Sequence, residues 1–231
     1  GPGETQLETD RRHIRRKIDK LREDLEEVRR VRSTQRQRRQ KNEIPVVAIV
    51  GYTNAGKSTL LNRLTGAGIL AEDKLFATLD PTTRSFYLED GQQILLTDTV
   101  GFIRKLPHHL IEAFKSTLEE ARYSDIILHV VDCSNPQMDM QMHVVKETLR
   151  ELEIVDKTVV TVFNKTDRFR EMESEGQPLQ QVPRDFSSDY QVRISAKTGE
   201  GLDELEKIFL TIIRSRRVLL EKVYAYSQAG R

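Results

Sequence analysis

The chain has 231 residues, of which 37% are hydrophobic and 32% are charged, and its formal net charge is +1. This length accommodates one domain of ordinary size and an additional segment. No apolar run approaches the roughly 20 residues that cross a bilayer, and no secretory signal is recognisable, so we expect no stable membrane insertion. Cys133 is the only cysteine, which excludes an internal disulfide and favours a reducing compartment. We expect it to be a small packed residue at a strand end.

Residues 1–44 are predicted to contain a glycine-rich start and then, from about Thr9, a charged helical segment. Apolar residues recur in this segment at spacings of three and four, which is the period of one helix face. They are Ile14, Ile18, Leu21, Leu25, Val28 and Val31. Such a narrow stripe suits a coiled-coil seam or a docking face.

Positive charge is concentrated in residues 29–41, which contain no acidic residue. The run is either a solvated helix face or a contact with phosphate backbones, which counterion release would favour. We favour a nucleic-acid contact because the run has no glutamate for i,i+4 ion pairs. Its cationic residues are Arg29, Arg30, Arg32, Arg36, Arg38, Arg39 and Lys41.

Residues 45–213 alternate strand and helix patterns, which predicts an α/β fold with a mostly parallel, doubly wound sheet. Residues 214–231 are predicted to be a C-terminal extension. The expected elements are a strand at 46–50 and a helix from 58, a hairpin of strands 85–88 and 93–97, strands at 125–131, 158–163 and 192–194, and helices at about 110–123, 141–153 and from 202.

A glycine-containing loop between the first strand and the first helix of this region carries the complete pattern G-x-x-x-x-G-K-S. Its glycines allow the backbone N–H groups to surround an anion, and the helix start adds its positive dipole end. Lys57 would reach the β- and γ-phosphates, and Ser58 would bind Mg²⁺. The sequence therefore predicts a nucleoside triphosphate site. Its residues are Gly51, Tyr52, Thr53, Asn54, Ala55, Gly56, Lys57, Ser58 and Thr59.

Residues 164–167, Asn-Lys-Thr-Asp, select the base. Asp167 would accept hydrogen bonds from two N–H donors of guanine, whereas adenine offers no such pair and would leave the carboxylate unpaired. Asn164 and Lys165 would tie this loop to the phosphate loop and cover the base. A backbone N–H in the segment Ser195, Ala196 and Lys197 can meet the guanine O6 atom. The predicted ligands are therefore GTP and GDP.

The order of these motifs resembles that of the translation-factor class of small GTPases, across residues 46–213. The resemblance implies that Asp98 is the carboxylate near Mg²⁺ and that the Gly101 N–H bonds the γ-phosphate. Thr78 is expected to close over Mg²⁺, because Phe76 and the residues after it resemble the switch-I pattern of Obg-like GTPases. Thr82 is the alternative. The catalytic candidates are Lys57, Thr78 and Gly101, and the metal candidates are Ser58, Thr78 and Asp98.

Phe102 stands where Ras-like GTPases carry a glutamine that orients water. A phenyl ring can neither orient nor deprotonate water, so we expect slow intrinsic hydrolysis. His108 and His109 are expected to be exposed, and His129 to be a core histidine. Asn54 matches a position at which some GTPases bind K⁺ beside the phosphates, and a turn-stabilising asparagine is the alternative.

The chain as a whole resembles the HflX family of ribosome-associated GTPases, within the Obg–HflX group. Residues 1–12, G-P-G-E-T-Q-L-E-T-D-R-R, are the most specific part, and residues 98–102, D-T-V-G-F, also match. Family members usually carry another domain before this segment, so we expect that domain to be missing here. The resemblance implies binding to the large ribosomal subunit and its RNA, GTPase activation there, and splitting or rescue of stalled ribosomes. The location would be cytoplasmic, or the mitochondrial matrix in a eukaryote.

Two other classes of function remain open at this point. One is a regulatory GTP-dependent switch that docks a protein partner through its coiled-coil helix without touching RNA. The other is the membrane-linked G domain of an ion transporter, against which the lack of apolar spans argues.

Overall fold

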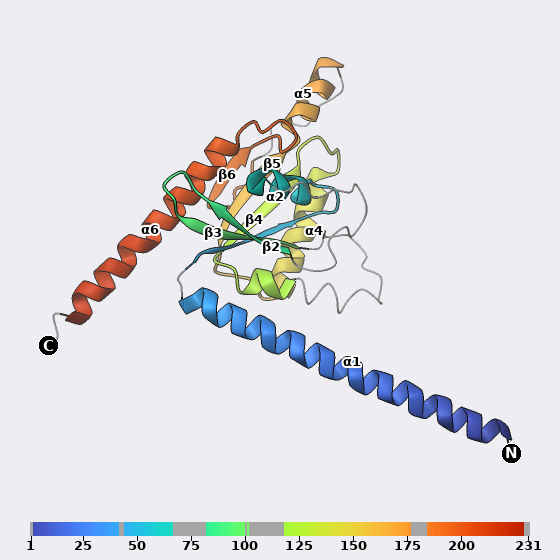
Figure 1. Ribbon diagram of the computed structural model, residues 1–231. Helices are drawn as coiled ribbons and strands as arrows, with labels where there is room; N and C mark the ends of the chain where they lie inside the picture. The colour runs from blue at the N-terminus through green and yellow to red at the C-terminus, as the bar shows by residue number, and fades with distance from the viewer. Residues whose placement is uncertain are drawn as a thin grey trace. The chain divides into compact units, whose positions relative to one another are not determined.

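The structure is a computed structural model, and it describes residues 2–41, 44–66, 82–99, 101, 118–176 and 184–228. The chain divides into two compact units, Gly1–Ile44 and Pro45–Arg231 (Figure 1). The first unit contains one helix, and the second contains a six-stranded sheet with helices on it. None of the described helices combines the length and the apolarity that a membrane crossing requires.

Helix α1 (Pro2–Lys41) is continuous over 40 residues, so it begins within the glycine-rich start and not at about Thr9 as predicted. The sequence after Gly3 explains the difference, since residues 4–8 contain neither glycine nor proline. Proline is also compatible with the first helical position, where its missing N–H needs no partner. The cationic run therefore belongs to the last turns of one long helix.

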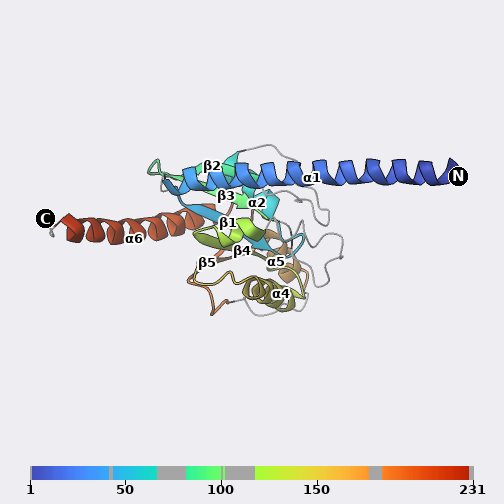
Figure 2. The same ribbon diagram turned by 90° about the horizontal axis from the view of Figure 1, so that it is seen from below.

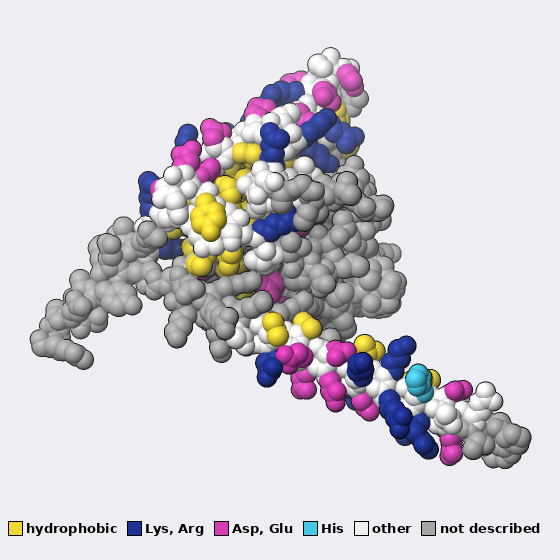
Figure 3. Space-filling view, in the orientation of Figure 1, with side chains coloured by type: hydrophobic (Ala, Val, Ile, Leu, Met, Phe, Trp, Pro, Cys, Tyr) yellow, Lys and Arg dark blue, Asp and Glu magenta, His cyan; other side chains and the backbone are white. Residues whose placement is uncertain are grey.

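The apolar stripe of α1 lies on its surface within the first unit. The exposed fractions of five of its side chains range from 43% to 60%, and Figure 3 shows hydrophobic side chains between charged ones along the helix. The five residues are Ile14, Ile18, Leu21, Val28 and Val31. One cation of the basic run does have an acidic partner, because Arg30 forms an exposed ion pair of 3.0 Å with Glu27. The argument that the basic run lacks acidic partners therefore does not apply to Arg30.

The second unit has the predicted α/β fold. Its strand order is β2-β3-β1-β4-β5-β6, in which β2 and β3 are antiparallel and the other neighbours are parallel. The strands are β1 (Val46–Gly51), β2 (Thr82–Tyr87), β3 (Gln93–Asp98), β4 (Ile126–Asp132), β5 (Thr158–Asn164) and β6 (Tyr190–Arg193).

The two faces of this sheet bury different apolar sets, because successive side chains of a strand point to opposite faces. Val47 and Ile49 of β1 pack in one cluster with α2 and α6, including Leu60 and Phe209. Ala48 and Val50 pack in another cluster with α4. Figure 2 shows α2 and α4 on opposite sides of the strands. The helices are α2 (Lys57–Thr65), α4 (Met138–Glu151), α5 (Thr166–Ser174) and α6 (Leu202–Gln228).

The predicted strands and helices are confirmed wherever the structure describes them, with boundaries that differ by a few residues. The helix expected at about 110–123 lies partly outside the described residues, and residues 118–122 are helical. Helix α6 continues without a break past residue 213, where the C-terminal extension was predicted to begin. Since the parallel strands share one direction, the loops after β1, β3, β4 and β5 and the chain after β6 meet at one edge of the sheet, where nucleotide sites of such folds occur.

Candidate nucleotide site

The phosphate loop occupies residues 52–56, between buried strand β1 and helix α2. Gly51 closes the strand at a place where a Cβ atom would overlap the carbonyl oxygen of Val130, so only glycine permits this approach of β1 to β4. Asn54 and Gly56 have φ angles of 61° and 96°, in the left-handed region. This alternation curls the backbone so that successive N–H groups converge, which is the geometry of an anion-binding nest.

Lys57, the first residue of α2, is buried, with 7% of its surface exposed. Its Nζ atom donates a hydrogen bond of 3.1 Å to the carbonyl of Tyr52 inside the loop. Burial lowers the pKa of Lys57 to about 8, and the charge of Asp98 opposes this shift. A buried ammonium group is held by anionic or carbonyl oxygens, so this position fits a phosphate contact.

Gly101 lies against the phosphate loop. A Cβ atom at this residue would stand 2.8 Å from Cγ2 of Thr53 and 3.1 Å from Nζ of Lys57. The absence of a side chain therefore leaves the Gly101 backbone close to the lysine that is expected to hold the terminal phosphates. This placement agrees with the expected N–H contact to a γ-phosphate, which stays a prediction.

Ser58 and Asp98 meet across α2 and the end of β3, where Ser58 Oγ donates a hydrogen bond of 2.9 Å to Asp98 Oδ2. A hydroxyl and a carboxylate are the oxygen donors that Mg²⁺ prefers, and the ion keeps several waters and phosphate oxygens among its ligands. The described residues contain no group of three or more His, Cys, Asp or Glu side chains that could hold a metal by themselves. The donor set fits a Mg²⁺ ion bound together with a nucleotide.

Asn164, the last residue of β5, joins three loops. Its Nδ2 atom donates to the carbonyl of Ala55 in the phosphate loop at 2.9 Å, and its Oδ1 atom accepts from the N–H of Ala196 at 2.9 Å. The side chain is 2% exposed, so both bonds are shielded from water. The loop that would bind the phosphates and the two loops that would bind the base are thereby held in one arrangement.

Lys165 has a φ angle of 67° and directly precedes α5. Its Nζ atom donates to the carbonyl of Asn54 at 2.7 Å and forms an ion pair of 2.8 Å with Oδ2 of Asp132. Asp132 was missed in the sequence. It ends β4 and is 7% exposed, and its Oδ1 atom accepts from both the N–H and the hydroxyl of Ser134. A carboxylate at the carboxyl end of a central strand was the available signal.

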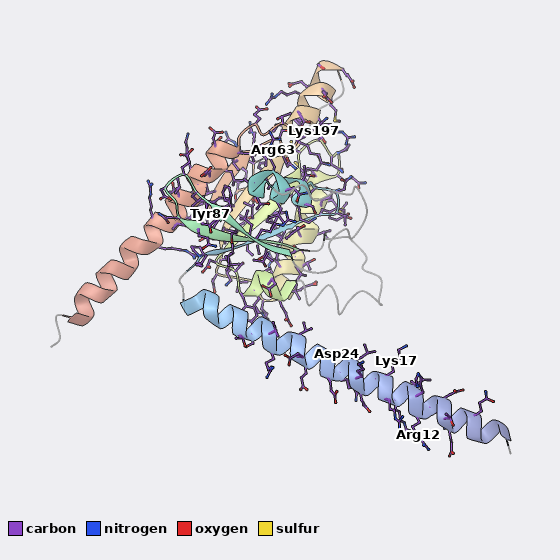
Figure 4. All side chains as sticks on the ribbon, viewed as in Figure 1. Arg12, Lys17, Asp24, Arg63, Tyr87 and Lys197 are labelled. Carbon is purple, nitrogen blue, oxygen red and sulfur yellow. The ribbon has the colours of Figure 1, made fainter. Side chains whose placement is uncertain are left out.

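Asp167 is fixed by a neighbour in the other base loop. The Ser195 hydroxyl donates to Asp167 Oδ1 at 2.8 Å and accepts from the N–H of Thr198 at 3.1 Å. Arg63, a second residue that the sequence did not reveal, donates from α2 to the carbonyl of Thr198 at 3.0 Å. Figure 4 shows Arg63 close to Lys197 at this end of the unit. The helix that begins at the phosphate loop thus also supports the loop expected at the guanine O6 atom.

Several predicted residues lie outside the described part of the chain, namely Phe76, Thr78, Phe102, His108 and His109. Thr82 begins β2, opposite Asp98 in the strand register. Because Thr78 is not described, the choice between Thr78 and Thr82 stays a prediction. Asn54 adopts the left-handed conformation that asparagine tolerates in turns, and the role in K⁺ binding is untested.

Two predictions about single side chains are confirmed. His129 is 2% exposed within β4, and burial lowers its pKa to about 4, as expected of a neutral core histidine. Cys133 follows β4 and is 8% exposed. Burial raises the pKa of its thiol to about 12, which leaves it protonated and unreactive.

Comparison with known proteins identifies the family. Residues 46–165, more than half of the chain, match a family model described as 50S ribosome-binding GTPase, and residues 1–39 match one described as GTP-binding GTPase Middle Region. A GTPase HflX from Lacrimispora saccharolytica is 68% identical over 231 residues, which are 100% of this chain and 53% of that protein. The chain belongs to the HflX family of GTPases. It spans about half the length of the curated HflX relatives that it matches.

Solved structures share the fold of the HflX G domain. A GTP-binding protein from Sulfolobus solfataricus in complex with GDP is 26% identical, with a TM-score of 0.55, and the match covers 81% of this chain and 58% of that chain. Era in complex with MgGDPNP and nucleotides 1506-1542 of 16S ribosomal RNA is 28% identical, with a TM-score of 0.54, over 73% of this chain and 56% of that chain. Both confirm the predicted P-loop GTPase fold.

Proposed function

We propose that this HflX family chain binds GTP and GDP together with Mg²⁺, hydrolyses GTP slowly, and acts on the large ribosomal subunit. The observation that carries the nucleotide part is the pair of hydrogen bonds by which Asn164 joins the phosphate loop to the base loops. Such a connection is useful only where one ligand has a phosphate end and a base end. Guanine is the base because Asp167, held by Ser195, offers a carboxylate to two N–H donors.

Different residues would contact the phosphates and the Mg²⁺ ion. The N–H groups of the curled loop and the ammonium of Lys57 bind the β- and γ-phosphates, and the Gly101 N–H meets the γ-phosphate from the other side. Bound Mg²⁺, held by Ser58 with Asp98 nearby, neutralises phosphate charge and orients the phosphate oxygens. Lys57 remains protonated throughout, because the phosphates supply the negative charge that its buried site lacks.

Hydrolysis is proposed to be slow because Phe102 occupies the place of the water-orienting glutamine. The large ribosomal subunit would then raise the rate by placing a water molecule or a charged group at the γ-phosphate. An activation of about 1000-fold corresponds to about 4 kcal/mol of barrier, which one positioned water or one added charge supplies. GTP turnover with and without purified large subunits tests this. Fast turnover by the chain alone, unchanged by subunits, would refute the proposal.

The ribosome contact is supported by the family description, 50S ribosome-binding GTPase, and by the positive run at residues 29–41. Replacing Arg36, Arg38 and Arg39 with Gln should weaken subunit binding and flatten its salt dependence by roughly one unit of slope per lost phosphate contact. A matched control makes the same charge change on the same helix, with Gln at Arg12, Arg15 and Arg16. Equal effects of the two triple variants would indicate general attraction instead of a contact at residues 29–41.

A second candidate function rests on the exposed apolar stripe of α1. Residues such as Ile14 and Leu21 are 57% and 60% exposed within the helix unit, which suits a coiled-coil partner protein. In that case binding to the partner would vary little with salt, whereas RNA contact weakens steeply.

For the ribosome-bound form we propose a role in splitting or rescuing stalled ribosomes in the cytoplasm. A sucrose-gradient assay of subunit dissociation with GTP tests that role.

A further inference from the structure

The loop that follows β6 contains the three backbone N–H groups that are candidates for the guanine O6 atom, and two of them already have acceptors in the protein. The Ser195 N–H donates to the carbonyl of Glu200 at 3.0 Å. The Ala196 N–H donates at 2.9 Å to Oδ1 of Asn164, which is buried. No described residue accepts a hydrogen bond from the Lys197 N–H. Among the three candidates, the Lys197 N–H is therefore the one that can bind a base without breaking a bond of the protein.

The backbone on both sides of Lys197 is held in place. On its amino side the preceding N–H is bound as described above. On its carboxyl side the Thr198 N–H donates to the Ser195 hydroxyl at 3.1 Å, and the Thr198 carbonyl accepts from Nη2 of Arg63 at 3.0 Å. A donor whose direction is fixed before the ligand arrives loses less conformational entropy on binding. These contacts therefore favour recognition of a base atom by the Lys197 N–H.

Arg63 reaches this loop from helix α2, and Gly199 leaves the space for it. A Cβ atom on residue 199 would stand 2.7 Å from Nη2 of Arg63 and 3.3 Å from its Nε atom. The guanidinium group thus lies against the loop backbone at Gly199 while it donates to the carbonyl of Thr198. The Arg63 side chain is exposed, so its hydrogen bond should contribute little to the free energy of unfolding. The main effect of this bond should be on the position of the loop.

We propose that the Lys197 N–H recognises the guanine O6 atom, and that Arg63 is a positioning residue that holds this N–H in the direction of the base. The inference rests on the proposed function, because it requires a guanine in the site. Under this assignment Lys197 binds the 6-position of the base, whereas Asp167 binds its N1 and 2-amino groups. Because different loops make the two contacts, loss of Arg63 should weaken recognition of the 6-position alone.

Three nucleoside diphosphates separate the two contacts. In 6-thio-GDP a larger sulfur atom, which is a weaker acceptor, replaces O6, whereas IDP lacks the 2-amino group. Competition against a fluorescent nucleotide near neutral pH measures their affinities for the full chain. We expect GDP to bind about fivefold more tightly than 6-thio-GDP, the value of one neutral hydrogen bond, and about 30-fold more tightly than IDP, the value of one hydrogen bond to a charged group.

The two affinity ratios of the parent chain have separate consequences. Equal affinity for GDP and IDP would contradict the proposed guanine site itself. A clear preference for GDP over IDP with equal affinity for GDP and 6-thio-GDP overturns only the present inference, because the base would then be bound without a contact to O6.

Arg63→Gln should lower the preference for GDP over 6-thio-GDP to about twofold and leave the preference over IDP unchanged. Arg122→Gln is the matched control. Arg122 is also exposed and donates to a backbone carbonyl, that of Leu152, at 3.1 Å, but it precedes the amino end of β4. This variant should keep both ratios. If Arg63→Gln leaves the 6-thio-GDP ratio unchanged, or lowers both ratios equally, the positioning role is overturned.

NMR identifies the donor directly. The amide proton shifts of residues 195, 196 and 197 are compared between the GDP and 6-thio-GDP complexes of the parent chain. We expect the largest difference at residue 197, because the shift of a hydrogen-bonded amide proton depends on its acceptor. A larger difference at residue 195 or 196 overturns the assignment to Lys197.

Discussion

Gly56 and Asn164 lie so close that a Cβ atom on residue 56 would overlap the Nδ2 atom of Asn164. The phosphate loop and the end of β5 are 108 positions apart in the chain, yet one glycine permits their contact. The same Nδ2 atom donates to the carbonyl of Ala55 at 2.9 Å. The second glycine of the phosphate motif therefore serves the connection to the base loop as well as the conformation of its own loop.

Replacing Gly56 with alanine should abolish nucleotide binding, because the new methyl group displaces Asn164 and disconnects the two halves of the site. Gly66→Ala is a matched control at the other end of α2. Both glycines have positive φ angles, 96° and 64°, so both variants carry backbone strain of about 1–2 kcal/mol, but Gly66 has open space around its Cβ position. We expect a loss of thermal stability in both variants, larger in Gly56→Ala because buried Asn164 is displaced, and a loss of GDP binding in Gly56→Ala alone. Intact GDP binding by Gly56→Ala would contradict the role given to Asn164.

Asp167→Asn should move the preference from guanine to xanthine, whose C2 oxygen can accept from the new amide. Loss of two hydrogen bonds to a charged group predicts a decrease in GDP affinity of about 100-fold or more, with a gain for XDP. Competition of GDP and XDP against a fluorescent nucleotide measures both. Asp203→Asn on the exposed first turn of α6 is the control. If Asp167→Asn binds GDP as tightly as the parent chain, the base assignment is wrong.

Ser58→Ala should weaken Mg²⁺-dependent GTP binding and leave binding in EDTA nearly unchanged. The residue capping α2 is Gly56, without a side-chain cap, and the Ser58 hydroxyl is bonded to Asp98 instead of the helix backbone. The loss of stability should therefore not exceed about 1 kcal/mol, the value of one hydrogen bond. Thermal unfolding of the nucleotide-free chain checks this, with Ser174→Ala on α5 as the control. A large decrease in the unfolding temperature would assign Ser58 a mainly structural role.

Nucleotide affinity should decrease as pH rises above about 8, the value to which burial lowers the pKa of Lys57. Below this pH the lysine is already charged in the nucleotide-free chain. Above it the free lysine is neutral, so binding of phosphates takes up a proton, and affinity falls by up to about tenfold per pH unit. The same shift from 10.5 makes the nucleotide-free chain more stable as pH rises between these two values, since the unfolded chain then binds more protons.

Calorimetry of GDP binding in two buffers of different protonation enthalpy measures that proton. We expect little uptake near neutral pH and close to one proton at about pH 9. Lys57→Arg places a group that stays charged over this pH range at the same position. Any proton taken up by guanine itself is common to both proteins, so the difference in proton uptake between them comes from the lysine. Equal uptake by the parent chain and by Lys57→Arg would show that the lysine is charged before the nucleotide arrives.

Much of this site could be predicted because its residues are consecutive in the chain. The phosphate loop and the segment 164–167 each follow a strand, and their residue types state their chemistry directly. The hairpin and the parallel strands could also be predicted, from alternating polar and apolar residues and from continuous apolar runs. The beginning of α1 could not be predicted in this way. Two glycines in three residues suggested a turn, but the long helical segment after them determines the conformation.

Asp132 and Arg63 were missed, because the position of a charged residue at a strand end or on a helix does not reveal its partner. Asp132 acquires its role only when parallel pairing brings the end of β4 beside Lys165 at the end of β5. Arg63 acquires its role only when α2 packs near the loop after β6. Such functions depend on tertiary neighbours, which a motif of consecutive residues does not contain.

Helix α6 is 27 residues long, or about 40 Å, and begins directly after the loop that contains Ser195 and Lys197. Its first part packs in the apolar cluster of the sheet, through residues such as Leu205 and Phe209. A helix is stiff along its axis, so a displacement of α6 would be transmitted to its packed end. That end adjoins the loop expected at the guanine O6 atom, and the position of this loop is therefore coupled to the position of the helix.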